Sequence, residues 1–195
     1  MEELRLSRFW KWAWIAFATA VLVFAIIAQS RRGTPTVSAA PFPGYPVPAF
    51  TLPQGSAGTR STVGTGASKS KTSTISLGQF VGKPMMINFW ASWCPPCQAE
   101  TPDLVTAYRQ FRNKVQFIGV NATAQDSPQS ARAFIKRYAI PYPVGFDSTN
   151  AVVNQFEVTG FPTTLFVNAQ GLIVARVDGA LNPGVMKADL EKIAQ

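Results

Sequence analysis

Two cysteines stand three residues apart in the segment Trp93-Cys94-Pro95-Pro96-Cys97, and the chain of 195 residues has no other cysteine. An apolar run precedes the pair and a helical pattern follows it, so Cys94 is expected at the opening of a helix. The unpaired amides and the positive end of the helix dipole favour a thiolate there. Because a thiolate attacks disulfides, we predict a redox-active disulfide Cys94–Cys97. Cys94, exposed at the edge of the helix, is the expected nucleophile, and Cys97 is the expected buried resolving thiol.

Two other uses of the cysteine pair remain open at this point. A purely structural disulfide would close a loop of four residues, which stabilises the fold by only about 2 kcal/mol. A zinc site built from two thiolates would be half-empty, because the sequence contains no histidine. The same absence excludes Ser-His-Asp and Cys-His catalysis and most copper enzymes. We therefore expect redox chemistry without a metal or cofactor.

The residues that must position this pair follow an α/β pattern from residue 75 to the C-terminus. The continuous apolar character of residues 85–91 is typical of a central strand covered on both faces. The order strand–helix–strand–helix, then strand–strand–helix, predicts a sandwich with parallel and antiparallel strands. Strands are predicted at 85–91, 115–120, 144–146, 163–167 and 172–177, and helices at 95–112, 127–138, 151–156 and 183–194.

These segments together resemble the thioredoxin superfamily, in particular its membrane-anchored thiol–disulfide oxidoreductases of the TlpA/ResA type. The resemblance implies an α/β thioredoxin-like fold, with a central mixed sheet flanked by helices. It rests on Ala-Phe-Thr-Leu-Pro at 49–53, Leu-Gly-Gln-Phe-Val-Gly-Lys-Pro at 77–84, Asn-Phe-Trp-Ala-Ser-Trp-Cys-Pro-Pro-Cys at 88–97, Glu-Thr-Pro at 100–102 and Gly-Phe-Pro-Thr-Thr at 160–164.

The resemblance assigns a substrate-binding surface beside the cysteines. Pro162 matches the cis-proline that faces the active-site disulfide in this superfamily. A cis peptide bond there would leave the main chain of Phe161 free to pair with an extended substrate. Trp93 completes the expected substrate-binding set. An ordinary trans proline before a strand is the alternative for Pro162.

The resemblance also assigns an acidic residue below the cysteines. Glu100 matches that residue, which would exchange a proton with Cys97. Asn88 stands where thioredoxin itself has a buried aspartate, so Glu100 would have to act without that second acid. The alternative is that Glu100 only complements the helix dipole in the first turn.

An apolar segment near the N-terminus predicts a membrane anchor. Residues 9–28 contain Lys11 as their only charge, and twenty helical residues span about 30 Å, the thickness of the hydrocarbon core. Trp10, Trp12 and Trp14 cluster at one end, where indoles prefer the headgroup region. A cleaved signal peptide and a buried soluble helix are the alternatives. We expect residues 1–32 to form a single-pass anchor in the cell membrane, with a cytoplasmic N-terminus and an extracytoplasmic domain.

A linker is expected between this anchor and the domain. Residues 33–53 contain six prolines, and residues 54–74 are mostly Gly, Ser, Thr and Ala, so neither stretch favours a helix. The predicted organisation is an anchor over 1–32, a linker over 33–74 and a domain over 75–195, with 48–53 able to join the domain as a first strand.

The net charge of +8 lies mainly outside the predicted domain. Residues 1–74 carry eight Lys/Arg and two Glu, whereas residues 75–195 carry ten basic and eight acidic residues. A basic surface clustered on a folded domain is therefore missing, and we expect no nucleic-acid binding.

The dipeptide between the cysteines indicates the direction of electron flow. Pro95 and Pro96 have no N–H, so two potential donors to a Cys94 thiolate are absent, which favours a reductant over an oxidant. We therefore expect a disulfide reductase that acts on disulfide-containing proteins and is recharged by a membrane thiol donor. The resemblance implies apocytochrome c as a substrate. The alternatives are an oxidase of secreted-protein thiols and a thioredoxin-like module that binds a metal or a peptide.

Overall fold

The computed structural model describes residues 17–21, 40–55 and 73–195. The chain divides into two units, residues 1–37 and residues 38–195. In the first unit only residues 17–21 are described, and they are helical. Most of the predicted anchor at 9–28 therefore lies outside the described residues. No helix among the described residues has the length and apolar character needed to cross a bilayer.

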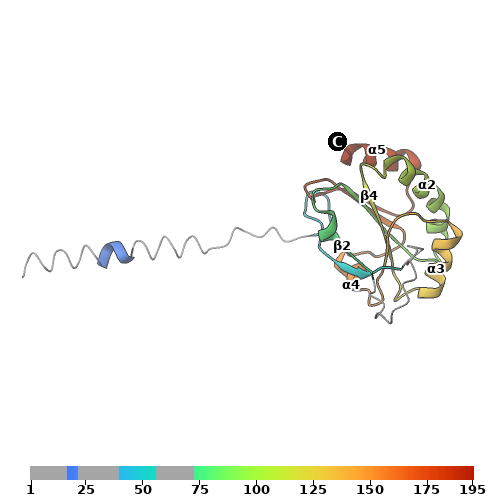
Figure 1. Cartoon of the computed structure of the whole chain (residues 1–195), viewed down its shortest axis with the longest axis horizontal. Helices are drawn as coiled ribbons and strands as arrows, with labels where there is room; N and C mark the ends of the chain where they lie inside the picture. Colours follow the sequence, from blue (N-terminus) through green and yellow to red (C-terminus); the bar gives the residue numbers. More distant parts are fainter. Residues whose placement is uncertain (1–16, 22–39, 56–72) are drawn as a thin grey trace, which may run out of the picture. The chain divides into compact units, whose positions relative to one another are not determined.

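A mixed sheet forms the centre of residues 38–195 (Figure 1). The strands of this sheet, in the order β5-β4-β3-β6-β7, are Val144–Phe146, Gln116–Asn121, Met85–Trp90, Thr163–Val167 and Ile173–Asp178. Strand β3 pairs in parallel with β4 and antiparallel with β6, in agreement with the predicted mixture of parallel and antiparallel strands. The remaining pairs are β4 with β5, in parallel, and β6 with β7, antiparallel.

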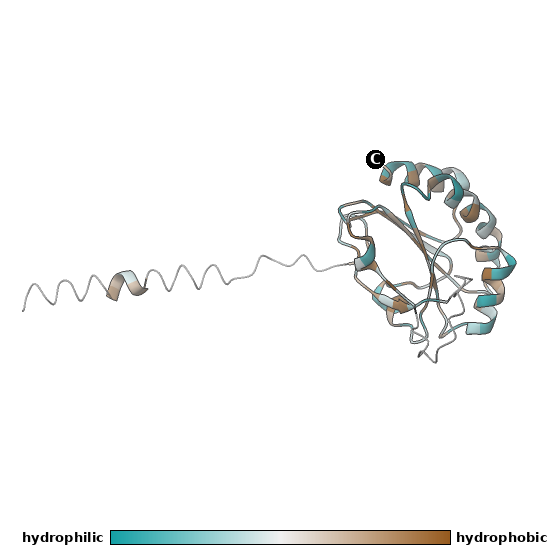
Figure 2. Ribbon diagram, in the orientation of Figure 1, coloured by the Kyte–Doolittle hydropathy of each residue, from teal (hydrophilic) through white to brown (hydrophobic). Residues whose placement is uncertain are grey.

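The helices begin where the sequence offers a capping side chain followed by proline. Ser127 caps α3 by accepting a hydrogen bond from the N–H of Ser130 at 2.9 Å, and Asn182 caps α5 through the N–H of Gly184 at 2.8 Å. The helices are α2 (Pro95–Phe111), α3 (Pro128–Arg137), α4 (Ala151–Gln155) and α5 (Pro183–Ile193). In Figure 2 the ribbons of these helices alternate between hydrophilic and hydrophobic residues, as expected for helices with one face on a core.

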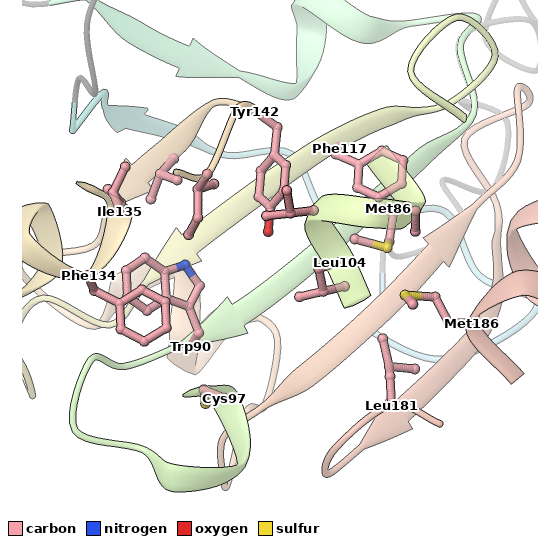
Figure 3. Packing of buried hydrophobic residues seen from close by; sticks show 14 of the residues in the cluster. Met86, Trp90, Cys97, Leu104, Phe117, Phe134, Ile135, Tyr142, Leu181 and Met186 are labelled. Carbon is pink, nitrogen blue, oxygen red and sulfur yellow. The ribbon is translucent and has the colours of Figure 1, made fainter. Parts of the chain in front are cut away.

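The alternating side chains of β3 enter two separate cores, because successive residues of a strand point to opposite faces. Met86 and Trp90 pack with residues of α2, α3 and α5 in the core that Figure 3 shows. Ile87 and Phe89 pack on the other face with residues of α4 and the N-terminal strands. All six residues of β3 are buried, so the predicted doubly covered strand is confirmed. The first residue of α2 thus follows a strand that both cores hold in place.

The domain begins before residue 75, the boundary expected from the sequence. Strand β1 (Thr51–Pro53) pairs with β2 (Thr74–Ser76), which leads into a 3₁₀ turn, η1 (Leu77–Phe80). Leu52 and Ile75 face each other in this pair and are both buried. The low-complexity stretch therefore lies between two paired strands. Its ends meet where the N–H of Gln54 donates to the carbonyl of Ser73 at 2.7 Å.

The described part of the proline-rich stretch also lies on the domain, although we expected a linker there. The N–H groups of Gly44 and Val47 donate to the carbonyls of Ile173 and Gly171, each at 2.9 Å. Proline cannot donate such bonds, but the residues between the prolines supply the N–H groups that proline lacks. The segment therefore attaches to the edge of the sheet without continuing it as a regular strand.

Arg176 on β7 holds the start of this segment. Its side chain is 7% exposed and pairs with Asp178 at 3.0 Å, and its guanidinium also donates to the carbonyl oxygens of Pro41 at 3.1 Å and Phe156 at 2.7 Å. The hydrogen bond from Arg176, aided by its charge, holds the pKa of Asp178 below its usual range. One buried cation thus joins residue 41 to the body of the domain.

Candidate active site

The two cysteines lie at the start of α2, just after the end of β3. Cys94 is the N-cap residue of α2 and Cys97 lies in its first turn. The two residues form the predicted disulfide bond. The pair therefore sits where a buried strand and a helix N-terminus meet.

The sulfur of Cys94 lies within reach of one main-chain donor of the first turn. The N–H of Cys97 donates to Cys94 Sγ at 3.2 Å. Pro95 and Pro96 occupy the first two helical positions and have no N–H to offer. After reduction, the same N–H would stabilise a thiolate on Cys94, which supports its assignment as nucleophile.

Exposure does not distinguish the two cysteines, contrary to our expectation that Cys94 is exposed at the helix edge. Cys94 is 2% exposed and Cys97 is 1% exposed. The disulfide bond and the N–H of Cys97 both draw the Cys94 sulfur onto the first helical turn. The distinction between the two thiols therefore rests on the hydrogen bond to Cys94, not on access of solvent.

Aromatic side chains flank the disulfide on the predicted substrate-binding side. Trp93 is 54% exposed, and its ring meets that of Phe161 edge-on, with 6.1 Å between the ring centroids. Trp93 Nε1 donates to the carbonyl of Gln125 at 2.8 Å, so the indole is held in place. The peptide bond between Phe161 and Pro162 is cis, as expected from the resemblance. In the described part of the chain, no main-chain hydrogen bond outside the helices and strands involves Phe161.

A buried polar cluster lies one helical turn after Cys97. Asn88 Nδ2, on β3, donates to Glu100 Oε1 at 3.0 Å and to Thr164 Oγ1, on β6, at 2.9 Å. The other oxygen, Glu100 Oε2, accepts the N–H of Leu181 at 2.8 Å. Glu100 is 4% exposed and Asn88 is 2% exposed. The structure thus brings Glu100 of α2 and Asn88 of β3 into direct contact.

Burial controls the ionisation of this cluster. It raises the pKa of Glu100, and the hydrogen bonds from Leu181 and Asn88 offset the increase only in part. Burial and the charge of Glu100 also raise the pKa of Tyr142 above its usual range. A carboxylate with a raised pKa is a stronger base than an ordinary one, and this is the property that a group needs in order to take a proton from a thiol.

A second polar cluster beside the cysteines was missed by reasoning from the sequence. Asp126, in the loop between β4 and α3, accepts the N–H of Ser92 at 2.7 Å and the Nδ2 of Asn121 at 2.9 Å on one carboxylate oxygen. The signal that points to this cluster is topological. Trp90 is in register with Asn121 in the parallel pair of β3 and β4, and the carboxyl ends of parallel strands meet at one edge of a sheet.

The described residues offer no obvious metal centre. Among residues 17–21, 40–55 and 73–195, no group of three or more Cys, Asp or Glu side chains is arranged to hold a metal ion.

The fold and the disulfide together define a class of protein. The structure resembles that of a thiol:disulfide interchange protein of the thioredoxin family from Chlorobium tepidum, with a TM-score of 0.63 and 22% identity, over 77% of this chain and 96% of the other. This similarity establishes an α/β thioredoxin-like fold with a mixed central sheet. Residues 43–176 match the AhpC/TSA family, and because the match spans more than half of the sequence, the chain belongs to that family.

Curated relatives narrow the comparison further. The chain is 31% identical over 113 residues to the thiol-disulfide oxidoreductase ResA of Bacillus subtilis, which is 57% of this chain and 62% of the relative. It is 33% identical over 123 residues to ResA of Oceanobacillus iheyensis, which is 63% of each chain. The chain therefore spans a little under two thirds of the length of these relatives.

Proposed function

We propose that this protein is a thiol–disulfide oxidoreductase that reduces disulfide bonds in other proteins through the Cys94–Cys97 pair. The observation that carries the proposal is a disulfide at the N-terminus of α2 whose first sulfur accepts the N–H of Cys97 at 3.2 Å. A disulfide in this position is poised to alternate between an oxidised pair and a thiolate stabilised by the helix. The names of the ResA relatives support the same chemistry.

The reaction proceeds in two exchange steps. The Cys94 thiolate attacks one sulfur of a substrate disulfide, which forms a mixed disulfide and releases the first substrate thiolate. The Cys97 thiolate then attacks Cys94 Sγ, which restores the Cys94–Cys97 disulfide and releases the second substrate thiolate. The substrate gains two electrons and the protein loses two. A thiol donor, which we place at the membrane, must return these electrons before the next cycle.

In the second step Glu100 accepts the proton that the Cys97 thiol must lose. Cys97 must lose its proton before it can attack, and Glu100 lies at the i+3 position of the same helix. The carboxyl group is buried with a raised pKa. A positioned acid or base of this kind contributes on the order of 10²–10⁴ to a rate.

The substrate binds along Phe161 and Trp93. We place the main chain of Phe161 on one side of the substrate and the half-exposed indole of Trp93, which meets the Phe161 ring edge-on, on the other. An extended segment of a disulfide-containing protein adds its main chain to such a free segment. Apocytochrome c, whose cysteines must be reduced before haem attachment, is a substrate of the expected kind.

The direction of electron flow follows from the donors that the thiolate lacks. The two prolines leave Cys97 to supply the helix N–H nearest to Cys94 Sγ, so the dithiol gains less stabilisation than in a strong oxidant. Strong oxidants of this superfamily have reduction potentials of about −120 mV, and thioredoxin has one of about −270 mV. We place the Cys94–Cys97 couple in the lower half of that interval. A reductase outside the cytoplasm needs a local electron supply, and an anchor over residues 9–28 would hold it beside a membrane donor.

The decisive experiment is the reduction potential of the Cys94–Cys97 couple, measured against glutathione or dithiothreitol buffers, together with turnover of a disulfide-bonded protein. A potential below about −195 mV with turnover by the dithiol form supports the reductase. A potential above about −150 mV would make the protein an oxidase of secreted-protein thiols.

Cys97→Ser should trap a mixed disulfide through Cys94, and Cys94→Ser is the matched control that should trap none. Trapping through Cys97 would reverse the assignment of the nucleophile.

A further inference from the structure

The loop between β4 and α3 holds the two residues before Cys94 with hydrogen bonds from several directions. Asp126 Oδ2 accepts the N–H of Ser92 at 2.7 Å, and Asp126 Oδ1 accepts the hydroxyl of Ser92 at 2.7 Å. One residue earlier, the carbonyl of Gln125 accepts the indole N–H of Trp93 at 2.8 Å. One short loop therefore fixes both Ser92 and the half-exposed Trp93.

The carboxylate itself is fixed by its own loop and by the neighbouring strand. Asn121 Nδ2, at the end of β4, donates to Asp126 Oδ2 at 2.9 Å, and the N–H of Ser127 donates to Oδ1 at 2.8 Å. Each oxygen thus accepts two hydrogen bonds. Burial works to raise the pKa of Asp126, but the hydrogen bonds from Asn121, Ser92 and Ser127 outweigh it and hold the pKa below its usual range. The group is therefore an anion that acts as an acceptor only.

The neighbours of Trp93 give this arrangement a functional consequence. The Trp93 ring stands edge-on to Phe161, with 6.1 Å between centroids, and Phe161 precedes the cis-proline. The distance between these two rings sets the width of the aromatic surface beside the disulfide. Ser92 connects the end of β3 to Trp93, so any movement of Ser92 moves the indole relative to Phe161.

We propose that Asp126 is a positioning residue for substrate binding: it holds Ser92, and through Ser92 it holds the Trp93 indole at the distance from Phe161 that admits an extended peptide next to Cys94. This inference rests on the proposed function, because it concerns the substrate surface of the same disulfide. Asp126 does not touch the reacting sulfurs. Its effect falls on the binding of a peptide, not on the reactivity of Cys94 toward a small reagent.

Asp126→Asn is the direct test. The amide group places an N–H₂ where two donors now point, so at least the main-chain N–H that pairs with that oxygen loses its partner, and the neutral amide oxygen that remains is a weaker acceptor than the carboxylate. We expect KM for a disulfide-bonded peptide to rise about fivefold or more with kcat changed less than twofold, because the peptide surface and not the chemistry is disturbed. The reaction of the reduced protein with a small aromatic disulfide should change less than about twofold.

Two further variants make the test selective. Ser92→Ala removes only the hydroxyl bond to Asp126 and should raise KM in the same direction by a smaller factor, and it decides the matter alone if Asp126→Asn does not fold. Ser127→Ala, in the same loop, loses the cap bond to the N–H of Ser130 but keeps its main-chain bond to Asp126. It should lower the melting temperature without raising KM.

Amide hydrogen exchange provides a readout that needs no substrate. Asp126→Asn should accelerate exchange of the Ser92 amide and the Trp93 indole N–H, whereas Ser127→Ala should not. An unchanged KM in Asp126→Asn, or an equal loss of rate toward the peptide and the small reagent, overturns the proposal. If the wild-type protein reduces no protein disulfide, the proposed function fails. Separately, unchanged exchange at Ser92 and Trp93 in Asp126→Asn would show that Asp126 does not hold these two residues.

Discussion

Two carboxylates close to the cysteine pair along the chain or through hydrogen bonds have pKa values that are shifted in opposite directions. Glu100 lies on α2 one turn after Cys97 and is 4% exposed, and its pKa is raised by burial. Asp126 lies in the loop before α3, bonds to Ser92 and is half-buried, and its pKa is lowered. Each carboxylate accepts a hydrogen bond from an asparagine, Asn88 in the first case and Asn121 in the second.

The difference lies in the balance between desolvation and the number of donors. Glu100 accepts two hydrogen bonds, from Asn88 and from the N–H of Leu181, and loses nearly all its contact with water. Asp126 accepts four and retains part of its hydration. Burial raises a carboxyl pKa and hydrogen bonds to the charged form lower it, so the outcome depends on which effect is larger. One site is thus suited to exchange a proton, and the other to remain a fixed anion.

The largest effect should come from neutralising Glu100, the carboxylate for which we propose proton exchange with Cys97. Glu100→Gln preserves shape, because a half-turn of the Asn88 amide presents its oxygen to the new N–H₂ and to the hydroxyl of Thr164. We expect resolution of the mixed disulfide to slow at least tenfold near pH 7, which is a lower bound because a positioned acid or base typically contributes about 10²–10⁴ to a rate. Attack by Cys94 should be less affected. Rapid-quench trapping of the mixed disulfide separates the two steps, and resolution at the wild-type rate would leave Glu100 a structural residue.

A smaller effect should follow when the partner of that carboxylate is removed. Asn88→Ala deletes the donor to both Glu100 and Thr164, and leaves a buried carboxylate oxygen without its side-chain partner. We expect a loss of about 1–3 kcal/mol in the free energy of unfolding, the usual cost of an unpaired buried polar group. Urea denaturation measures this loss, and Thr164→Val, which removes the other acceptor of Asn88, is the matched control. A loss below about 0.5 kcal/mol would mean that water replaces the amide.

The lesson about prediction from sequence also follows from these clusters. The caps Ser127-Pro128 and Asn182-Pro183 and the apolar run at 85–91 are local signals, and the structure confirms the elements that they predict. Glu100 was singled out by the family resemblance, and helical spacing after Cys97 placed it on the same face of the helix. By contrast, Asp126 becomes part of the site only through the pairing of β3 with β4, and a distant pairing leaves no local pattern.

The attachment of residues 41–47 was not predicted for a related reason, whereas the possible first strand at 48–53 is confirmed by β1. The prolines between residues 41 and 48 argue against regular structure, and nothing local shows that Gly44 and Val47 will bond to the main chain of residues 171–173. The burial of Cys94 was equally invisible, because spacing places a residue at a helix start but does not reveal what covers it. Local rules therefore predicted the elements, and tertiary contacts decided the boundary and part of the site.

Stability measured against pH should separate the two carboxylates by sign. The folded pKa of Glu100 is raised, so its stabilising contribution is present below its usual pKa of 4.5 and is lost as pH rises through the folded value. The folded pKa of Asp126 is lowered, so its contribution is present above 3.8 and is lost as pH falls through the folded value.

The corresponding variants should therefore diverge. Relative to the wild type, Glu100→Gln should become more stable as pH rises from 4 toward 7, whereas Asp126→Asn should lose most stability above pH 4 and least below pH 3. The two differences should have opposite signs, and in a domain of this size each 1 kcal/mol corresponds to about 2–4 °C in melting temperature. Calorimetry over this pH range gives both curves, and parallel curves would show that the two carboxylates do not differ in ionisation.

The smallest effect should come from deleting residues 1–37. Both carboxylate clusters lie within residues 38–195, which form their own unit, so the truncated protein should keep its reduction potential and its turnover within about twofold of the full chain in detergent.

A longer truncation, of residues 1–47, should behave differently. It removes the hydrogen bonds that Gly44 and Val47 donate to the main chain of the domain. It also removes the carbonyl of Pro41, so the nearly buried guanidinium of Arg176 loses one of its hydrogen-bond acceptors. We expect this second protein to unfold at lower urea concentration while its cysteines keep their potential, since neither carboxylate touches the deleted segment. Equal stability of the two truncated proteins would show that residues 38–47 do not stabilise the domain and belong to the linker. If the protein without residues 1–37 fails to fold, part of those residues belongs to the domain.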